Sequence, residues 1–453
     1  MQHSHTTYEQ AGSLKKTLKL WHVVVLGLGY LTPMTVFDTF GIVSQDTDGH
    51  VPTAYLIALI AMLFTAASYG KMVKEFPTAG SAYSYTSKAI NPHLGFMVGW
   101  VSLLDYFFLP MINVLLAKIY LSAAFPGVPE WIWVVSVTLL FTLVNIRSVN
   151  LTANFNTLLV IFQILVTGFF VILSIKALMA GKGAGTVATV EPFFSTGMTM
   201  PHLMAGAAVL CFSFLGFDAV TTYTEEAVNP TKTIPRGIVL VALIGGLIFT
   251  TASYFATAVI PDVSILKNPD SPSPEIAYLL GGAFFQSLFL AGAITGTIAS
   301  GLASHTSASR LLFAMGREKV LPGKFLAYVH PRYSTPINSI IVTGVFCLAA
   351  VWFDLDTALS FINFGALTAF TAVNISVVIY FVVRKKQNSL SSLIQYVLFP
   401  ALGAGFVGYL WVSLDVQSIT LGLIWAALGL GYLLYSTKGF TKKPPKMDFE
   451  EAI

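Results

Sequence analysis

Two aspartates stand near the middle of long apolar stretches of this sequence, where an ionised side chain is costly. Asp105 lies about 13 residues into the stretch 92–124, or roughly 20 Å along a helix that rises ~1.5 Å per residue. Asp218 lies near the middle of the stretch 201–224. An ionised carboxylate at the centre of a bilayer costs at least about 2.5–3.5 kcal/mol, so each should face a bundle interior and have a partner. A substrate cation, a proton or a neighbouring side chain such as Lys118 would serve.

The elements that must position these carboxylates are interrupted at matching places. Pro33 falls near the middle of the first long apolar stretch, and Gly216 and Asp218 near the middle of the sixth. In lipid, a helix can break only where it lines a cavity or meets protein, because unpaired backbone groups cost several kcal/mol. Paired breaks in two halves of a chain indicate the binding site of a transporter. Kinks without function are the alternative, because membrane helices tolerate Pro and Gly.

The composition is that of an integral membrane protein. Among 453 residues, 55% are hydrophobic and only 10% are charged, whereas soluble proteins carry roughly a quarter charged residues. Apolar runs of about 20 residues recur along the chain, which predicts a helical bundle rather than a barrel. No removable signal peptide is expected, and Cys211 and Cys347 are expected to pack as small apolar side chains. The net charge of +4 does not indicate nucleic-acid binding, because it comes from short loops beside membrane helices.

The hydropathy predicts twelve transmembrane helices in an all-α fold with a five-plus-five inverted repeat and broken helices 1 and 6 (the LeuT-like fold). Nearly all Lys and Arg residues fall on one side of the membrane, and only Lys176, Lys182 and Lys267 fall on the other, so both termini should be cytoplasmic. The expected spans lie near 20–44, 53–75, 92–124, 130–148, 156–180, 201–224, 237–260, 276–312, 337–353, 357–383, 393–412 and 417–437. The expected segments are an N-terminal tail (1–19), a transport core (20–385, with repeats 20–190 and 195–385), two additional helices (390–437) and a C-terminal tail (438–453).

Longer motifs surround the breaks. They include the loop Glu75-Phe-Pro-Thr-Ala-Gly-Ser-Ala-Tyr-Ser-Tyr85 and the run Gly216-Phe-Asp-Ala, followed by Glu225-Glu-Ala-Val-Asn-Pro230. With the breaks, these motifs resemble those of the amino acid–polyamine–organocation transporters over nearly the whole chain. The stretches 31–44, 48–52, 103–106, 109–113, 153–156 and 362–366 resemble the bacterial putrescine importers most. The resemblance implies alternating access and proton-driven uptake through the bacterial inner membrane.

The first break separates two classes of substrate. In the amino acid carriers that this chain resembles, the residues matching Pro33-Met34-Thr35 are typically Gly-x-Gly, whose amides at a helix N-terminus bind a carboxylate. Proline brings no amide donor, so an α-carboxylate would be poorly held. A diamine needs carboxylates and an apolar corridor instead. Asp105 and Asp218 would bind its ammonium groups, with the Met34–Thr35 backbone at one end.

The remaining candidates each have a structural alternative. Tyr106 offers an aromatic face to an ammonium group, or packs as an ordinary aromatic side chain. Candidates with paired interpretations are Phe212, Phe214 and Phe217 (a substrate sleeve or core), Asp38 (an outer vestibule or the membrane interface), Glu225 and Glu226 (an inner gate, by capping or by pairing with Lys232 or Arg236) and His305 (a titrating group or a packed histidine).

The sequence contains no phosphate-binding loop, nucleophile elbow or metal-ligand spacing, so we expect no enzyme, cofactor or metal site. A transporter without a nucleotide-binding domain must draw on an ion or substrate gradient. The sequence thus predicts a proton-coupled importer of putrescine or a similar diamine. Two alternatives remain: a permease of basic or neutral amino acids with the same fold, and a channel or sensor that binds amines without transport.

Overall fold

The computed structural model describes residues 18–77, 82–147, 153–225, 227–317, 321, 323–331 and 335–445. These ranges contain helices and turns, with one isolated bridge between Leu18 and Ala227. The elements are α1 (Leu20–Leu31), α2 (Val36–Asp46), α3 (Val51–Glu75), α4 (Ala82–Ala89), α5 (Pro92–Ala124), α6 (Glu130–Ile146), α7 (Ala153–Met179), α8 (Met200–Leu210), η1 (Cys211–Phe214), η2 (Ala219–Glu225), α9 (Pro230–Val259), η3 (Val263–Ile265), α10 (Ser273–Arg317), α11 (Gly323–Leu326), α12 (Ile337–Cys347), η4 (Leu348–Val351), α13 (Leu355–Val378), η5 (Ile379–Arg384), α14 (Leu390–Leu393), η6 (Ile394–Leu398), α15 (Phe399–Val412) and α16 (Val416–Ser436).

The described helices confirm an all-α membrane protein. Nine are long and apolar enough to cross a bilayer, and α1 with α2 forms a tenth candidate, bent by 53° at its break. Two shorter apolar helices, Glu130–Ile146 and Ile337–Val351, occupy the places of the expected fourth and ninth spans. The chain is therefore a multi-pass membrane protein.

The first break lies where the sequence predicts it. α1 ends at Leu31, Thr32 has a positive φ of 50°, and α2 begins at Val36. Pro33 has no amide hydrogen to continue the α1 ladder, so the helix ends before it. The Thr35 hydroxyl donates to the carbonyl oxygen of Leu31 at 2.7 Å and so satisfies one backbone group that the break leaves open.

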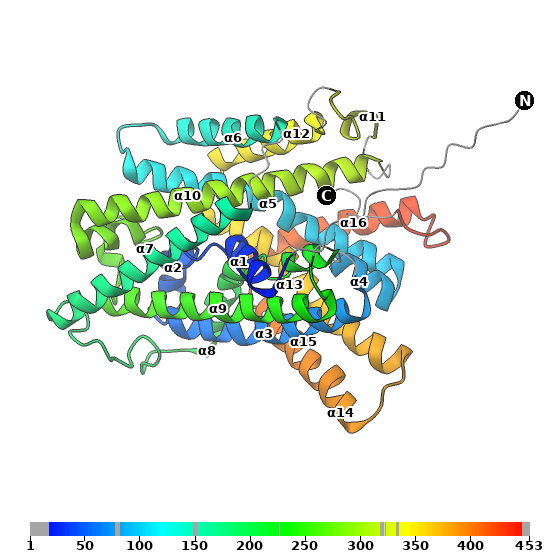
Figure 1. The fold of residues 1–453 in the computed structure, drawn as a ribbon, viewed down its shortest axis with the longest axis horizontal. Coiled ribbons are helices and arrows are strands. Elements are labelled where there is room, and N and C mark those ends of the chain that lie inside the picture. The colour runs from blue at the N-terminus through cyan, green and yellow to red at the C-terminus, as the bar shows by residue number, and fades with distance from the viewer. Residues whose placement is uncertain are drawn as a thin grey trace, which may run out of the picture.

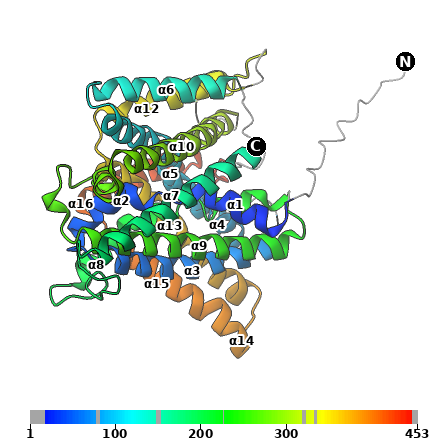
Figure 2. The same ribbon diagram turned by 60° about the vertical axis from the view of Figure 1, so that its left-hand side comes forward.

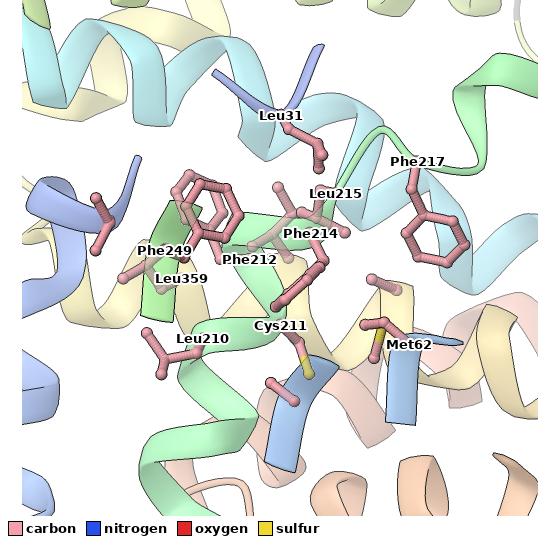
Figure 3. Packing of buried hydrophobic residues seen from close by; sticks show 14 of the residues in the cluster. Leu31, Met62, Leu210, Cys211, Phe212, Phe214, Leu215, Phe217, Phe249 and Leu359 are labelled. Carbon is pink, nitrogen blue, oxygen red and sulfur yellow. The ribbon is translucent and has the colours of Figure 1, made fainter. Parts of the chain in front are cut away.

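The second break is also confirmed. α8 ends at Leu210, the chain tightens into the 3₁₀ turn η1, and Gly216 then adopts a φ of +107° before η2 begins. Only glycine adopts such a backbone readily. The two breaks meet here: a Cβ atom on Gly216 would lie 2.8 Å from the Cβ atom of Tyr30. Figure 3 shows the buried residues around this turn, with Leu31 of the first break beside Leu215 of the second.

The other helices enclose the two breaks. α3 packs along α9, and α5 packs against both α10 and α13, with α1 near the centre of the bundle (Figures 1 and 2). α6 and α12 lie together at one edge, and α14 and α15 lie at the opposite edge (Figures 1 and 2). This arrangement places residues 30–35 and 211–218 among long helices on several sides.

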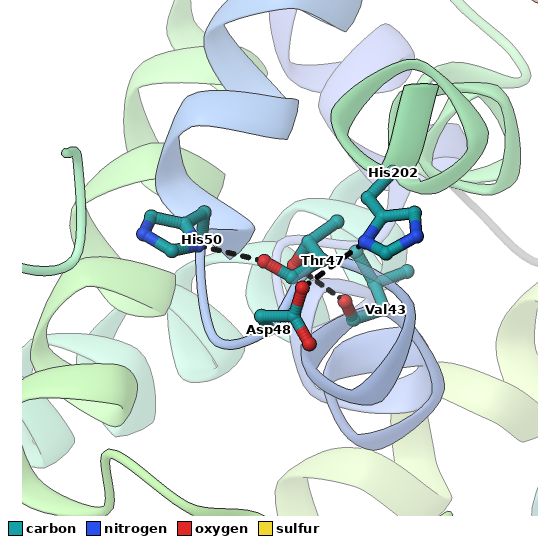
Figure 4. A network of polar contacts seen from close by, with 5 residues as sticks. All are labelled: Val43, Thr47, Asp48, His50 and His202. Atoms are coloured by element: carbon teal, nitrogen blue, oxygen red, sulfur yellow. Dashed lines mark hydrogen bonds and ion pairs between the residues drawn. The ribbon is translucent and has the colours of Figure 1, made fainter. Parts of the chain in front are cut away.

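One polar turn ties the far ends of the two broken spans together (Figure 4). Between α2 and α3, Asp48 and Gly49 both have positive φ, and the Nδ1 atom of His50 donates to the carbonyl oxygen of Thr47 at 2.7 Å. The Asp48 carboxylate lies 3.0 Å from the Nδ1 atom of His202 in the first turn of α8. The end of α2 is thereby fixed to the start of α8.

Candidate functional site

Asp105 and Asp218 come together between α5 and the second break. Their carboxylates lie near enough for the two charges to interact. Asp218 accepts hydrogen bonds from the amides of its own turn, including those of Gly216 and Ala219. Asp105 has no hydrogen-bond donor or cation beside it within the part of the chain that the structure describes. Lys118, the sequence's alternative partner, instead pairs with Glu130 at 3.7 Å. Asp105 is therefore a half-buried carboxylate with no partner cation among the described residues.

Tyrosine side chains surround this acid pair. Tyr106 and Tyr30 both interact electrostatically with Asp105 and Asp218. The hydroxyl of Tyr69 on α3 lies 3.5 Å from the Oδ2 atom of Asp218. Tyr106 was predicted from the sequence, whereas Tyr30 and Tyr69 were not. The position of Tyr30 three residues before Pro33 is a usable signal, whereas nothing in the local sequence of α3 distinguishes Tyr69.

A small cavity of about 30 Å³ lies between the two breaks, α5 and α10, and its lining includes Tyr30, which interacts with both aspartates of the acid pair. Asp105 stands one helical turn before Leu109, which lines the cavity together with later residues on the same face of α5. The cavity holds one acidic side chain, Asp38, and no basic one. It therefore favours a cation. The lining residues are Tyr30, Leu31, Thr32, Thr35, Asp38, Leu109, Asn113, Leu116, Phe212, Leu215, Thr297 and Ser300.

The start of α2 offers few donors to an anion in this cavity. The amides of Thr35, Phe37 and Asp38 already donate to carbonyl oxygens within the turn, at 2.9–3.0 Å. Pro33 contributes no amide. The Asp38 side chain in the first turn of α2 would also repel a substrate carboxylate. The helix N-terminus at the first break is therefore unfavourable to an anion, as the interpretation of Pro33-Met34-Thr35 expects.

Asp38 is held by a single phenolic donor. The hydroxyl of Tyr120, near the end of α5, donates a hydrogen bond to its Oδ1 atom. This bond fixes the carboxylate at the cavity wall.

We expect Tyr120→Phe to destabilise the folded protein by about 1–3 kcal/mol, because the substitution leaves the half-buried Asp38 carboxylate without its donor. Thermal unfolding of the purified protein in detergent measures the loss. Tyr435→Phe is the matched control, because Tyr435 is 84% exposed, and it should melt with the wild type. Equal melting of Tyr120→Phe and wild type would contradict the structural role of this bond.

The three phenylalanines that were predicted to form an apolar sleeve lie in different surroundings. Phe212 lines the cavity. Phe214 packs in the core against Tyr55 and Phe249, and Phe217 packs against Tyr69 and Phe370. Figure 3 shows Phe217 apart from the cluster formed by Phe212, Phe214 and Phe249.

Met34 and Thr35 lie at the first break, as expected, but their side chains face different elements. Thr35 lines the cavity, whereas the Met34 sulfur lies against Gly292 of α10, where a Cβ atom would be 2.8 Å away. Met34 is buried at 3% exposure and is not among the cavity-lining residues. Its side chain therefore packs against α10, and only its backbone belongs to the break.

The other gate or coupling candidates are His305, which lies away from the cavity, and Glu225 and Glu226, whose side chains lie outside the described part of the chain. His305 is buried on the α6-facing side of α10, with its Nδ1 atom 3.2 Å from the side-chain nitrogen of Asn145. Within the described residues, no group of three or more His, Cys, Asp or Glu side chains could hold a metal ion.

Comparison with known proteins places this arrangement in a family. Residues 22–414 match the amino acid permease family. The low-affinity putrescine importer PlaP of Escherichia coli strain K12 is 48% identical over 449 residues, which cover 99% of each protein. The methylthioribose transporter and the branched-chain amino acid permease BcaP of Bacillus subtilis strain 168 are 29% and 27% identical, each over 94% of both chains. The expected resemblance is confirmed: the protein is a transporter and not an enzyme, and it belongs to the amino acid permease family of the amino acid–polyamine–organocation superfamily.

Proposed function

We propose that this protein imports putrescine, or a similar diamine, by proton-coupled alternating access. The observation that carries the proposal is the charge of the site: the cavity lining has one carboxylate and no basic side chain, and its lining residue Tyr30 interacts with two further carboxylates, Asp105 and Asp218. A substrate with its own carboxylate would meet repulsion there, and a diamine would not. The 48% identity to a putrescine importer over 99% of the chain supports the same substrate.

In this proposal, Asp105 and Asp218 bind the ammonium groups. Extended putrescine measures roughly 6 Å between its nitrogen atoms, by ordinary bond lengths. Tyr106 would attract an ammonium group through its aromatic face, which contributes about 0.5–2 kcal/mol. Phe212 would line the methylene groups, whereas Phe214 and Phe217 would support the fold around the second break.

The same proposal extends to the topology. The ten candidate spans and two shorter helices would form twelve transmembrane segments, of which the first ten make two inverted five-helix repeats, 20–190 and 195–385. The segment 390–437 would add two helices outside the repeats. Both termini would lie in the cytoplasm, which the distribution of Lys and Arg supports, and the membrane would be the bacterial inner membrane.

Proton coupling requires a group that gains and loses a proton during the cycle. Our candidate for this group is Asp38, because it is the acidic side chain that lines the cavity. Binding of a cation between the carboxylates would favour release of a proton from any of them. Glu225 and His305 remain gate or coupling candidates on sequence grounds.

Uptake of labelled putrescine into proteoliposomes tests this function. We expect uptake that concentrates putrescine when the lumen is more alkaline than the medium, and that falls to equilibration when a protonophore is added. Unchanged concentrative uptake after the protonophore would contradict the proton coupling. Binding of putrescine without any concentrative uptake would contradict import and favour a sensor or channel.

An amino acid permease is the second candidate, because relatives with 27–29% identity over 94% of their length include a branched-chain amino acid permease. The same vesicles separate the two. For a diamine importer, excess lysine, ornithine or leucine should leave putrescine uptake nearly unchanged. Inhibition by ornithine at concentrations like those of putrescine would favour the amino acid permease. Cadaverine should compete, because one methylene group in an apolar corridor is worth only about 1–3 kcal/mol.

A further inference from the structure

A large groove lies on the outside of the bundle, between the last turns of α3 and the first turns of α9. Its volume is about 800 Å³, far larger than that of the central cavity. α3 and α9 run side by side along one face of the molecule (Figures 1 and 2). Gly70 lets the two helices approach at the groove, because its missing Cβ would lie 3.1 Å from the Cβ of Pro235.

Four cationic side chains line this groove. Lys71 and Lys74 stand three residues apart on α3, and Lys232 and Arg236 stand four residues apart on α9, so each pair shares one helical face. Lys71 is already engaged, because its Nζ atom donates to the carbonyl oxygen of Gln395. Lys74, Lys232 and Arg236 are exposed.

No carboxylate neutralises these charges within the described residues. The groove lining contains no acidic side chain. Glu75, the neighbour of Lys74, accepts hydrogen bonds from Lys385 at 2.5 Å and from Tyr380 at 2.7 Å. This bond from Lys385 to Glu75 holds the pKa of the Lys385 amino group above its usual value. Glu75 is therefore committed to a different partner, and Lys74 remains available.

The walls of the groove are apolar and continue along both helices. Ala67 on α3 and Leu240 on α9 belong to the lining. Ile60 and Leu247 follow on the same helical faces, seven residues further from the basic end, and both are exposed. A basic end with an apolar track leading away from it fits an amphiphilic anion better than free phosphate, which has no use for the track.

We propose that this groove binds an anionic phospholipid, with its phosphate between Lys74, Lys232 and Arg236 and an acyl chain along Leu240 and Leu247. Basic pockets between membrane helices bind such headgroups, and each Lys or Arg near an anionic lipid strengthens binding roughly five-fold. The site lies on the far side of α3 from Tyr69, so it is separate from the acid pair.

Native mass spectrometry of the full chain in detergent, titrated with phosphatidylglycerol or phosphatidylcholine, tests the proposal. We expect retention of phosphatidylglycerol in preference to phosphatidylcholine, and weakening by roughly 100-fold in the variant K74Q/K232Q/R236Q. The control K438Q/K442Q/K443Q removes as many charges from exposed positions outside the groove and should bind like the wild type. Equal retention of both lipids, or equal loss in both variants, would overturn the proposal.

One further variant and one competition experiment complete the test. Val239→Trp keeps every charge but fills the groove, so it should also weaken lipid binding. This variant tests the proposal even if K74Q/K232Q/R236Q does not fold. Inorganic phosphate at millimolar concentration should not displace the lipid, and displacement would show a simple phosphate site instead. A third outcome is that neither the wild type nor K74Q/K232Q/R236Q binds lipid, but the lipid-free wild type melts at a higher temperature. That result would contradict the proposal and show that the chain's own acidic residues fill the groove.

Discussion

Asp105→Asn should reduce putrescine uptake by roughly 10- to 150-fold at subsaturating substrate. A hydrogen bond to a charged group contributes about 1.5–3 kcal/mol, and each 1.4 kcal/mol changes an equilibrium tenfold. Asparagine keeps the shape of the side chain and removes only its charge. Because Asp105 has no partner cation within the described residues, its charge is free to bind the substrate rather than to hold the fold. Initial rates in proteoliposomes, over a range of putrescine concentrations, measure the effect.

The matched control for this variant is Asp262→Asn. Asp262 lies in the loop after α9, where its carboxylate accepts a hydrogen bond from the Ser264 amide at 2.9 Å, and an asparagine oxygen can accept the same bond. We expect wild-type uptake in the control and unchanged thermal stability in both variants. Undiminished uptake by Asp105→Asn would remove this residue from the binding site. A comparable loss of uptake and stability would assign it a structural role.

The breaks were predictable from sequence because their causes are local. Pro33 lacks an amide hydrogen and Gly216 tolerates positive φ, so both breaks can be predicted without knowledge of the residues that pack around them. The cost of a midplane charge likewise identified Asp105 and Asp218. Each of these inferences needs only the residue and its depth in an apolar stretch.

What the sequence could not predict depends on packing between distant segments. Tyr69 reaches Asp218 across 149 positions of the chain, and Tyr120 reaches Asp38 across 82. Hydropathy places such residues in a span but does not rank the faces of a helix that is apolar all round. The division of Phe212 from Phe214 and Phe217 has the same origin, because a 3₁₀ turn and a break send neighbouring side chains in different directions.

The contact between the two breaks predicts the second large effect. Gly216→Ala should destabilise the protein by about 2–5 kcal/mol and reduce uptake more than tenfold. An L residue at positive φ costs roughly 1–2 kcal/mol, and an added methyl group in a packed site typically costs about 1–3 kcal/mol. At Gly216 the φ is +107°, and the methyl group would lie 2.8 Å from Tyr30. Relief of the clash would move Tyr30, which lines the cavity, and the backbone amides that hold Asp218.

Gly431→Ala separates this effect from that of glycine replacement as such. Gly431 lies within α16, and an added Cβ atom there would meet nothing within 4 Å. Alanine stabilises a helix interior relative to glycine by up to about 1 kcal/mol, so the control should melt at or above the wild-type temperature and transport normally. If Gly216→Ala behaved like the control in both melting and uptake, the two breaks would not form one rigid contact. If Gly216→Ala melted like the wild type but transported poorly, the contact would serve the transport cycle. The conformation described here would then accommodate the methyl group, whereas another conformation of the cycle would not.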